Sequence, residues 1–446
     1  MSIWGKAKHF LIYVNYMIPS LFDLSVYSIC SIISGIMTSK WIGTTAMGAV
    51  SVASPYISFI YAYGLIFGVG GSTVISIHRG RGDESTAKEV FSLNIACMTA
   101  TTILISLAAF VFTKQLASLL GATPENTKYV VQYLRIITLF SLPYGFSYML
   151  GMMLKADGHP LVGLIGSTAA TATNLILLFV LTEAIHMGIA GVAMASAMSQ
   201  VVLSLVYLGH FLSKRSSLKF VPFLFRWKKV WHIIRLGVPD ALSEGSPGIF
   251  AMAFNYLVYR NMGETGIVVF SVINYISLLT TQMLLGATQG MSPLVSFYKG
   301  KQDLVLEKLY HRFAQYVAIA ISALVFAVCM LKTDWVVAQF ISPNEMEAYQ
   351  AGLRALRIFS WFLPFAGFTI VSIGYLSAIQ RPQYSQFLSL FRGLVGVVAF
   401  GIVLSRLWGE IGIWLAPVAS EGVSFLIALW MLSSEKRIQI HRLRSN

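Results

Sequence analysis

Twelve apolar runs, each of about 20 residues or more, follow one another along this chain and leave little sequence between them. A run of that length crosses the hydrocarbon core of a bilayer as a helix. Because the runs show no ten-residue alternation of apolar and polar residues, they predict helices and not the strands of a membrane barrel. We therefore expect an all-α polytopic membrane protein with twelve transmembrane helices, over residues 11–38, 46–77, 90–113, 129–153, 160–182, 187–212, 233–259, 266–298, 313–331, 353–377, 384–405 and 411–433.

The charged residues are few and are placed asymmetrically. Only 11% of the residues are charged and 56% are hydrophobic, whereas a soluble domain carries about a quarter charged residues. Most of the 32 Lys and Arg lie at the two termini and in every second loop, a pattern that predicts that both termini are cytoplasmic. We expect the net charge of +14 to reflect this topology and contact with membrane lipids, and we expect no nucleic acid partner.

The two halves of the chain are related by an internal repeat. A shift of 220 residues aligns residues 43–88 with 263–308 without a gap, and 11 of those 46 positions are identical, where composition alone would give about four. The offset then grows, to 224 where Gly188 meets Gly412. Each half holds six predicted spans, so both copies enter the membrane in the same direction, as in a parallel repeat.

The repeat predicts two lobes of six helices, residues 1–212 and 233–434. A basic segment, 213–232, joins them, and a basic tail, 435–446, follows. The joining segment interleaves aromatic with cationic side chains, which suits a linker at the cytoplasmic headgroups, and a plain solvated loop fits it equally well. Two such lobes are typical of transporters that work by alternating access, with the substrate between the lobes.

The motifs of several other protein classes do not occur in the sequence. It has no GxxxxGK[ST] loop, so we expect no direct use of ATP. It has no HExxH pair, so we expect no metal site, no cofactor and no enzymatic activity. The cysteines stand singly in apolar runs and are expected to be core residues, at positions 30, 97 and 329.

Five segments stand out from the general apolar pattern. In chain order they are GVGGSTVISIHRGRGDESTAKEVFS, LKADGHPLVGLIGSTAATATNLIL, MGIAGVAMASAMSQ, GVPDALSEGSPGIFAMAFN and QGMSPLVSFYKGKQD. Together they resemble the multidrug and toxic compound extrusion (MATE) family, and within it the bacterial DinF-like or MepA-like branch. The resemblance covers nearly the whole chain.

This resemblance implies a secondary antiporter that exports small amphiphilic organic cations in exchange for sodium ions or protons. It also implies a multi-pass protein of the bacterial inner (cytoplasmic) membrane, and we expect a monomer. The alternative within the same superfamily is a flippase or exporter of a lipid-linked or anionic metabolite, which the mainly acidic charges inside the spans disfavour. A channel or a membrane enzyme finds less support, because a channel needs no duplicated carboxylate helix and an enzyme needs a convergent catalytic set.

The first span departs from the family pattern at its acidic residue. Many members resembled here carry an Asp nine residues before the Gly that ends this span, and counting back from Gly43 gives Ser34. A carboxylate stands eleven residues before Ser34, at Asp23, which is three turns away on the same helix face. Asp23 either replaces the missing carboxylate or is an Asp held in place by nearby hydroxyls.

Glu244 is the strongest candidate for cation coupling. It lies in GVPDALSEGSPG, whose two prolines free backbone carbonyls of the helix. These carbonyls, the carboxylate and the hydroxyls of Ser243 and Ser246 offer an oxygen-rich site for sodium, and a buried carboxyl equally suits a proton. Asp23 is its near-equivalent in the first lobe. A Glu that only holds helices together is the structural alternative.

Two further charges inside spans lie at similar depth, Arg392 in the eleventh span and Glu421 in the twelfth. Neighbouring antiparallel helices can bring them together as a structural or a coupling charge pair. Asp240 lies near a helix start and is expected at the cytoplasmic interface. The polar side chains that we expect to face a lumen and bind substrate are Asn255, Asn274, Gln282 and Gln289.

Overall fold

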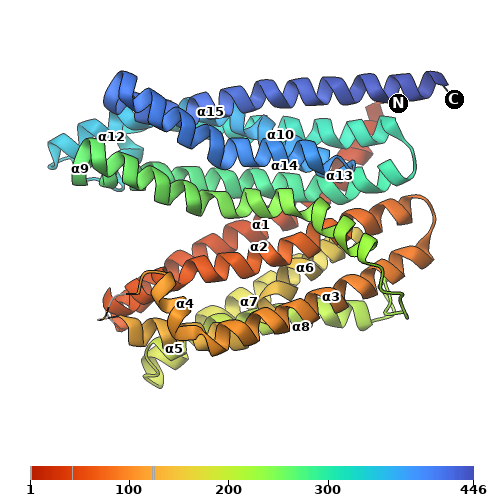
Figure 1. Cartoon of the computed structure of the whole chain (residues 1–446), viewed down its shortest axis with the longest axis horizontal. Coiled ribbons are helices and arrows are strands. Elements are labelled where there is room, and N and C mark those ends of the chain that lie inside the picture. Colours follow the sequence, from red (N-terminus) through yellow and green to blue (C-terminus); the bar gives the residue numbers. More distant parts are fainter. Residues whose placement is uncertain (1–2, 43, 123, 125, 446) are drawn as a thin grey trace. The chain divides into compact units, whose positions relative to one another are not determined.

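The structure is a computed structural model that describes the backbone of residues 3–42, 44–122, 124 and 126–445. Within the helices, side chains are described except at 3–4, 26–32, 35–36, 39–41, 44–48, 243–253, 256, 264 and 436–445. The described chain is almost entirely helical (Figure 1).

The helices of the first half are α1 (Ile3–Trp41), α2 (Thr44–Gly80), α3 (Glu84–Val111), α4 (Thr113–Leu119), α5 (Thr127–Leu139), α6 (Ser141–Ala156), α7 (Pro160–Phe179), η1 (Val180–Ala184) and α8 (Ile189–Leu212). Those of the second half are α9 (Trp227–Gly300), α10 (Leu304–Leu331), α11 (Thr333–Ala338), α12 (Met346–Phe359), η2 (Ser360–Phe362), α13 (Leu363–Ala378), α14 (Pro382–Leu390), η3 (Phe391–Val395) and α15 (Gly396–Ser445).

All twelve predicted spans coincide with helices. Among the described residues, eight helices are long and apolar enough to cross a membrane, and nine are if α5 and α6, bent by 53°, form one broken span. One of the eight, Pro382–Glu435, is 54 residues long and contains the last two predicted spans. The other two predicted spans, 11–38 and 233–259, lie in α1 and α9, where many side chains are outside the described set.

Glycines in the left-handed region mark the points where the chain turns back. Gly188 precedes α8 with φ 58° and ψ −140°, Gly263 interrupts α9 with φ 63° and ψ −148°, and Gly409 interrupts α15 with φ 57° and ψ −128°. An L side chain is strained in this conformation, which is why glycine stands there. Gly188 and Gly409 share this conformation and are therefore partners in the repeat. Their separation of 221 residues is three less than the offset of 224 that the identity of Gly188 with Gly412 predicts.

The loops between the fourth and fifth spans of each half have the same backbone. Gly158 (φ 89°) follows α6 and Gln380 (φ 63°) follows α13. In each loop the N–H of the next residue donates to a carbonyl five residues earlier, at 2.9 and 2.8 Å. This is a Schellman ending, and Pro160 or Pro382 then opens the next helix without needing an N–H partner.

The helix contacts divide the chain into two compact units. The first unit is Met1–Ala241 with Pro293–Glu307, and the second is Leu242–Ser292 with Lys308–Asn446. The beginning and the last turns of α9 therefore pack with the first unit, although the repeat assigns them to the second lobe. The lobe boundaries drawn from the repeat, 1–212 and 233–434, stay a prediction.

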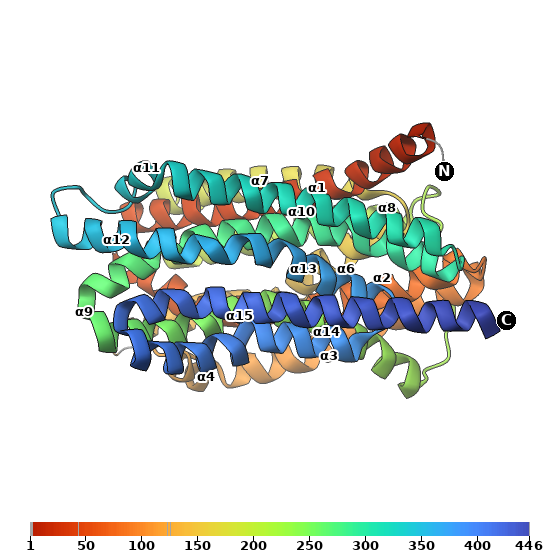
Figure 2. The same ribbon diagram turned by 90° about the horizontal axis from the view of Figure 1, so that it is seen from above.

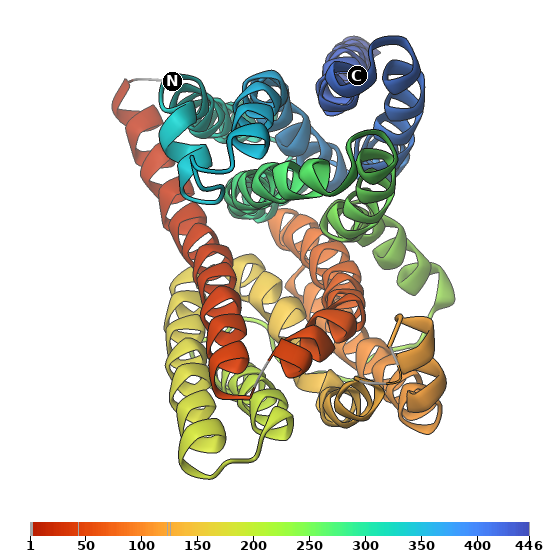
Figure 3. The same ribbon diagram turned by 90° about the vertical axis from the view of Figure 1, so that its left-hand side faces the viewer.

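In the first unit α2 runs beside α6 (Figure 1), while α1 lies along α7 (Figure 3). Two glycines that are partners in the repeat allow helix ends to cross backbone against backbone. A Cβ on Gly80 would lie 2.0 Å from the Phe297 carbonyl oxygen, and one on Gly300 would lie 2.1 Å from the Ile77 carbonyl oxygen. This reciprocal contact leaves no room for any other residue at either position.

In the second unit α13 packs against α14 and α15, and Figure 2 shows α14 beside the returning end of α15. Ile373, Leu388 and Ala428 form a buried apolar cluster between these helices. Helix positions in this unit are therefore fixed by packing around α13.

Candidate functional site

An ion pair between Arg392 and Glu421 lies inside the second unit. Both side chains are nearly buried, with 9% and 3% of their surface exposed. Arg392 is held by a wide π-helical turn, Phe391–Val395, and Glu421 stands one turn after Pro417 in α15. The structure thus pairs the two charges that the sequence places at similar depth.

A small cavity adjoins this pair and has a volume of about 60 Å³. Its lining residues are Asn274, Ser277, Leu278, Thr281, Phe359, Phe362, Arg392, Gly393, Val397, Pro417 and Glu421. A space of this size accommodates a few water molecules or a small ion, whereas pockets for drug-sized ligands measure about 300–1,000 Å³. Within the second unit the charge pair therefore faces an ion-sized space.

A second charge pair lies in the first unit, around Asp23. This carboxylate of α1 is half-buried, accepts a side-chain hydrogen bond from Ser167 of α7, and lies within electrostatic reach of Lys155 of α6 and Tyr207 of α8. Lys155 is only 8% exposed, and its Nζ lies 3.7 Å from the sulfur of Met152. Three helices, α6, α7 and α8, therefore bring polar groups to this one carboxylate of α1.

Ser34 also contacts α7, since its hydroxyl donates to Asn174 Oδ1 at 3.2 Å. Asp23 and Ser34 thus reach the same neighbouring helix, as expected for two positions on one face of α1. The carboxylate of the first unit lies at Asp23, and the Ser34 position is held by a neutral hydrogen bond.

Lys155 is the residue of this site that sequence reasoning missed. The pattern of loop cations includes it among the residues that mark the cytoplasmic side, because it lies in the predicted loop between the spans 129–153 and 160–182. Its burial depends on the direction in which α6 presents it, which hydropathy does not report. The signal in the sequence is the position of this lysine within the segment LKADGHP, directly after an apolar run.

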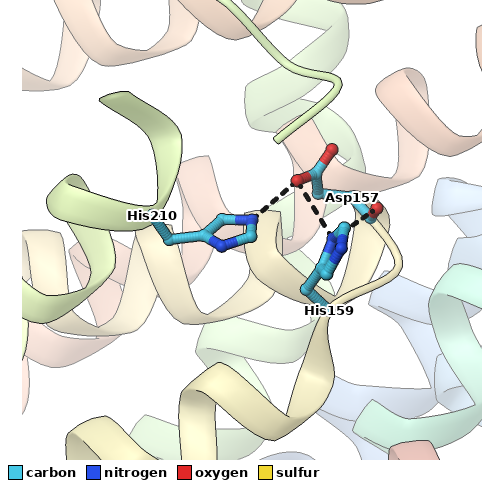
Figure 4. A group of neighbouring side chains, drawn as sticks. All are labelled: Asp157, His159 and His210. Atoms are coloured by element: carbon cyan, nitrogen blue, oxygen red, sulfur yellow. Dashed lines mark hydrogen bonds and ion pairs between the residues drawn. The ribbon is translucent and has the colours of Figure 1, made fainter. Parts of the chain in front are cut away.

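Asp157, in the loop between α6 and α7, is surrounded by hydrogen-bond donors of the joining segment and by two histidines. Its Oδ1 accepts the backbone N–H groups of Ser217 and Leu218 at 3.0 and 3.2 Å and the Ser217 hydroxyl at 2.5 Å. Its Oδ2 lies 2.9 Å from His210 Nε2 and 3.4 Å from His159 Nδ1 (Figure 4). Asp157 therefore ties the beginning of the joining segment to the ends of α6 and α8.

These hydrogen bonds also set the acidity of Asp157. Burial alone would raise its pKa, but hydrogen bonds from Ser217, His210 and Ser216 outweigh burial and hold the pKa below its usual range. The side chain is therefore a charged carboxylate at neutral pH. Among the described residues, Asp157, His159 and His210 bring three ligand-type side chains within 4.8 Å of one another, close enough to hold a metal ion.

The residues predicted to bind substrate lie in different surroundings. Asn274 lines the cavity beside the charge pair. Gln282 and Gln289 are half-buried in α9, and Asn255 is exposed. The structure brings none of the other three to the cavity lining.

The predicted coupling residue Glu244 and its neighbours Ser243 and Ser246 lie in the helical backbone of α9. Their side chains are outside the described residues, so their roles stay a prediction. Asp240 is half-buried and belongs to the first unit.

Known proteins match this chain over nearly its full length. The family model MatE matches residues 19–180 and 249–401. The multidrug export protein MepA of Staphylococcus haemolyticus is 25% identical over 447 residues, which is 98% of this chain and 96% of the relative. MepA of Staphylococcus aureus (strain MRSA252) is 22% identical over 436 residues, 95% of this chain and 93% of the relative.

Solved structures match the fold as well. An outward-facing multidrug resistance MATE family transporter of the MOP superfamily has a TM-score of 0.89 at 22% identity, over 98% of this chain and 97% of its own. A MOP superfamily transporter from Pyrococcus furiosus has a TM-score of 0.88 at 22% identity, over the same shares. These structures have twelve helices in two lobes, which confirms the predicted fold class. Because the family model matches most of its length, the chain belongs to the MatE family of multi-pass membrane transporters.

Proposed function

We propose that this chain exports small amphiphilic cations in exchange for sodium ions or protons, by alternating access between its two lobes. The observation that carries the proposal is the carboxylate of Asp23, half-buried among Lys155, Ser167 and Tyr207. Ionisable groups inside membrane spans are costly and mark ion or substrate pathways. The multidrug export proteins of Staphylococcus that the chain resembles support export of drugs.

The Lys155 ammonium gives Asp23 a cation when no coupling ion is bound. A bare buried carboxylate is strongly unfavourable, so a carrier that must release its ion needs a replacement charge. A sodium ion or a proton that reaches Asp23 takes over this role, and Lys155 recovers it when the ion leaves. Antiport follows if the coupling ion and the cationic drug favour opposite-facing states.

Glu244 is the proposed counterpart in the second lobe, with Ser243 and Ser246 as further oxygen ligands. The proposal for these three rests on the sequence, on the two prolines that flank Glu244 and on its near-equivalence to Asp23. Asn255, Asn274, Gln282 and Gln289 are proposed to contact substrate. We further propose that the protein acts as a monomer in the bacterial cytoplasmic membrane with both termini in the cytoplasm.

Arg392 and Glu421 are proposed to serve a different purpose. The pair joins η3 to α15 and keeps the adjoining ion-sized cavity polar without net charge. Arginine keeps its charge in proteins, so Glu421 has a permanent partner. We assign this pair to the packing of the second unit and not to ion exchange.

The test is efflux of ethidium from proteoliposomes under an imposed sodium or proton gradient. One gradient is expected to drive efflux by the parent protein, and Asp23→Asn and Glu244→Gln are each expected to abolish it with the protein still folded. Glu410→Gln is the matched control, because Glu410 stands at the surface with 36% of its side chain exposed. If neither gradient moves a cationic dye, the proposal is wrong, and anionic and lipid-linked substrates become the next ones to test.

A further inference from the structure

We propose that Asp157, His159 and His210, the Asp157 cluster, bind a divalent transition-metal ion of the zinc type. The three residues come from the ends of three helices. Asp157 follows α6, His159 precedes α7, and His210 lies in the last turn of α8 (Figure 4). The site lies at the end of the first unit and is separate from the Asp23 pair.

The ligand set is one that zinc-type ions prefer. Two imidazole nitrogens and one carboxylate oxygen are found together in zinc and non-haem iron centres. The three candidate ligand atoms lie within 4.8 Å of one another, with Asp157 Oδ2 2.9 Å from His210 Nε2 and 3.4 Å from His159 Nδ1. Zinc bonds of about 2.0–2.1 Å in a tetrahedron place the ligand atoms about 3.4 Å apart. The two separations from Asp157 are thus already close to those of a zinc site, and the two imidazoles start no more than 4.8 Å apart.

The two oxygens of Asp157 have separate partners. Oδ1 is occupied by the backbone N–H groups of Ser217 and Leu218 and by the Ser217 hydroxyl, while Oδ2 faces the imidazoles. Hydrogen bonds to the second oxygen of a ligating carboxylate orient it and are a regular part of metal sites. The carboxylate is thus held in place before any ion arrives.

Burial differs among the three ligands in a way that suits an accessible site. The side chains of Asp157 and His210 are 0% and 5% exposed, whereas that of His159 is 41% exposed. An ion can therefore approach past His159 and keep a water as its fourth ligand. Acidic groups at a surface often gather without a metal, but a fully buried carboxylate between two imidazoles is a more specific arrangement.

A positive neighbour opposes metal binding but does not face the ligand atoms. Arg79 Nη1 lies 3.9 Å from Asp157 Oδ1, on the side of the joining segment. The same guanidinium donates to Glu84 at 3.2 Å and to the Ala156 carbonyl at 2.5 Å. Its charge is thus shared with another carboxylate, and Oδ2 stays available to the ion.

The repeat partner of this loop shows that the fold itself does not require histidines here. In the second unit Arg381, which also follows a Schellman ending, binds Glu435 near the end of the last span, at 2.7 and 2.8 Å. A plain ion pair thus suffices to attach this loop to the last helix of a half. The first unit uses two imidazoles and a carboxylate instead.

The experiment is a titration of Zn²⁺ into the purified full-length protein in detergent, carrying no His tag, followed by calorimetry and by the shift in thermal unfolding. We expect saturable binding of one ion per chain and a rise in unfolding temperature. His159→Ala removes a ligand that is 41% exposed, so the variant should fold, and it is expected to weaken the affinity by at least about tenfold. His210→Ala should do the same.

Two controls make the outcome decisive. His186→Ala removes an exposed histidine outside the cluster and should leave the affinity unchanged. His78→Ala tests the other histidine next to a carboxylate, since its Nδ1 lies 3.0 Å from Asp83 Oδ2. The proposal is overturned if the parent shows no saturable Zn²⁺ binding, if His159→Ala binds as tightly as the parent, or if only His78→Ala loses the ion.

Discussion

Each unit holds a carboxylate of a membrane span next to a cation, and the two pairs differ in both cation and surroundings. In the second unit Glu421 is bound directly by Arg392, and both side chains are nearly buried. In the first unit Asp23 is half-buried and lies within electrostatic reach of Lys155 and Tyr207, with Ser167 beside it. Arginine keeps its charge, whereas a lysine and an aspartate can both become neutral by exchanging one proton. Of the two pairs, only Asp23 and Lys155 can therefore change their charge state at modest cost.

The same contrast recurs at the loops that follow the fourth span of each half. Both loops have a left-handed residue, Gly158 or Gln380, and a proline at the start of the next helix. One loop is tied by Arg381 to Glu435, and the other by Asp157 to His210. The two halves therefore share the backbone conformation of this loop but differ in the side chains that attach the loop to the last helix of the half.

The largest expected effect is that of Arg392→Met. It leaves the buried carboxylate of Glu421 without its partner and should lower the free energy of unfolding by about 3–5 kcal/mol. The measurement is thermal or denaturant unfolding in detergent. Arg392→Met/Glu421→Gln removes both charges and should recover most of the loss. If Arg392→Met alone is as stable as the parent, Arg392 and Glu421 do not form a permanent ion pair.

Lys155→Met should cost less, about 1–3 kcal/mol by the same unfolding measurement. Asp23 is half-buried, keeps its hydrogen bond with Ser167, and can accept a proton when the ammonium is gone. The comparison between the two pairs fails if Lys155→Met destabilises the protein as much as Arg392→Met does.

The smallest effect is expected for Arg354→Ala, which removes a surface ion pair. Arg354 Nη2 lies 4.0 Å from Glu410 Oε1, and the side chains are 64% and 36% exposed. Exposed pairs contribute about 0–1 kcal/mol, so unfolding and ethidium efflux should both stay close to those of the parent. If Arg354→Ala lowers the free energy of unfolding as much as Lys155→Met does, the solvent exposure of an ion pair does not determine its contribution to stability.

Each of the twelve predicted spans falls in helical structure, because an apolar run of about 20 residues is a strong signal in the sequence. It also anticipated that Arg392 and Glu421 share a depth, since depth follows from counting residues along neighbouring spans. The rotation of a helix and contacts between distant helices do not follow from such counts. The charge pattern therefore places Lys155 in a loop, and nothing in the sequence indicates that His210 approaches Asp157, 53 residues earlier in the chain.

The repeat illustrates the same limit. Identical letters predict an offset of 224 at Gly188, whereas the backbone shows that Gly409 is its structural partner. The turn itself requires a glycine with positive φ, which is Gly409. Gly412 is a glycine for another reason, because a Cβ there would lie 1.9 Å from the Leu404 carbonyl oxygen. Two glycines three residues apart are equally good matches by letter, and only their conformations separate them.

The most direct test of the account is the dissociation constant of ethidium for the purified protein, measured over a range of sodium concentrations and of pH. If the drug and the coupling ion are linked through Asp23, raising one of the two ions should weaken ethidium binding by about 5–150-fold. Asp23→Asn should remove this dependence, whereas the surface variant Glu410→Gln should keep it. A dissociation constant that responds to neither ion, or that responds equally in Asp23→Asn, would contradict the account.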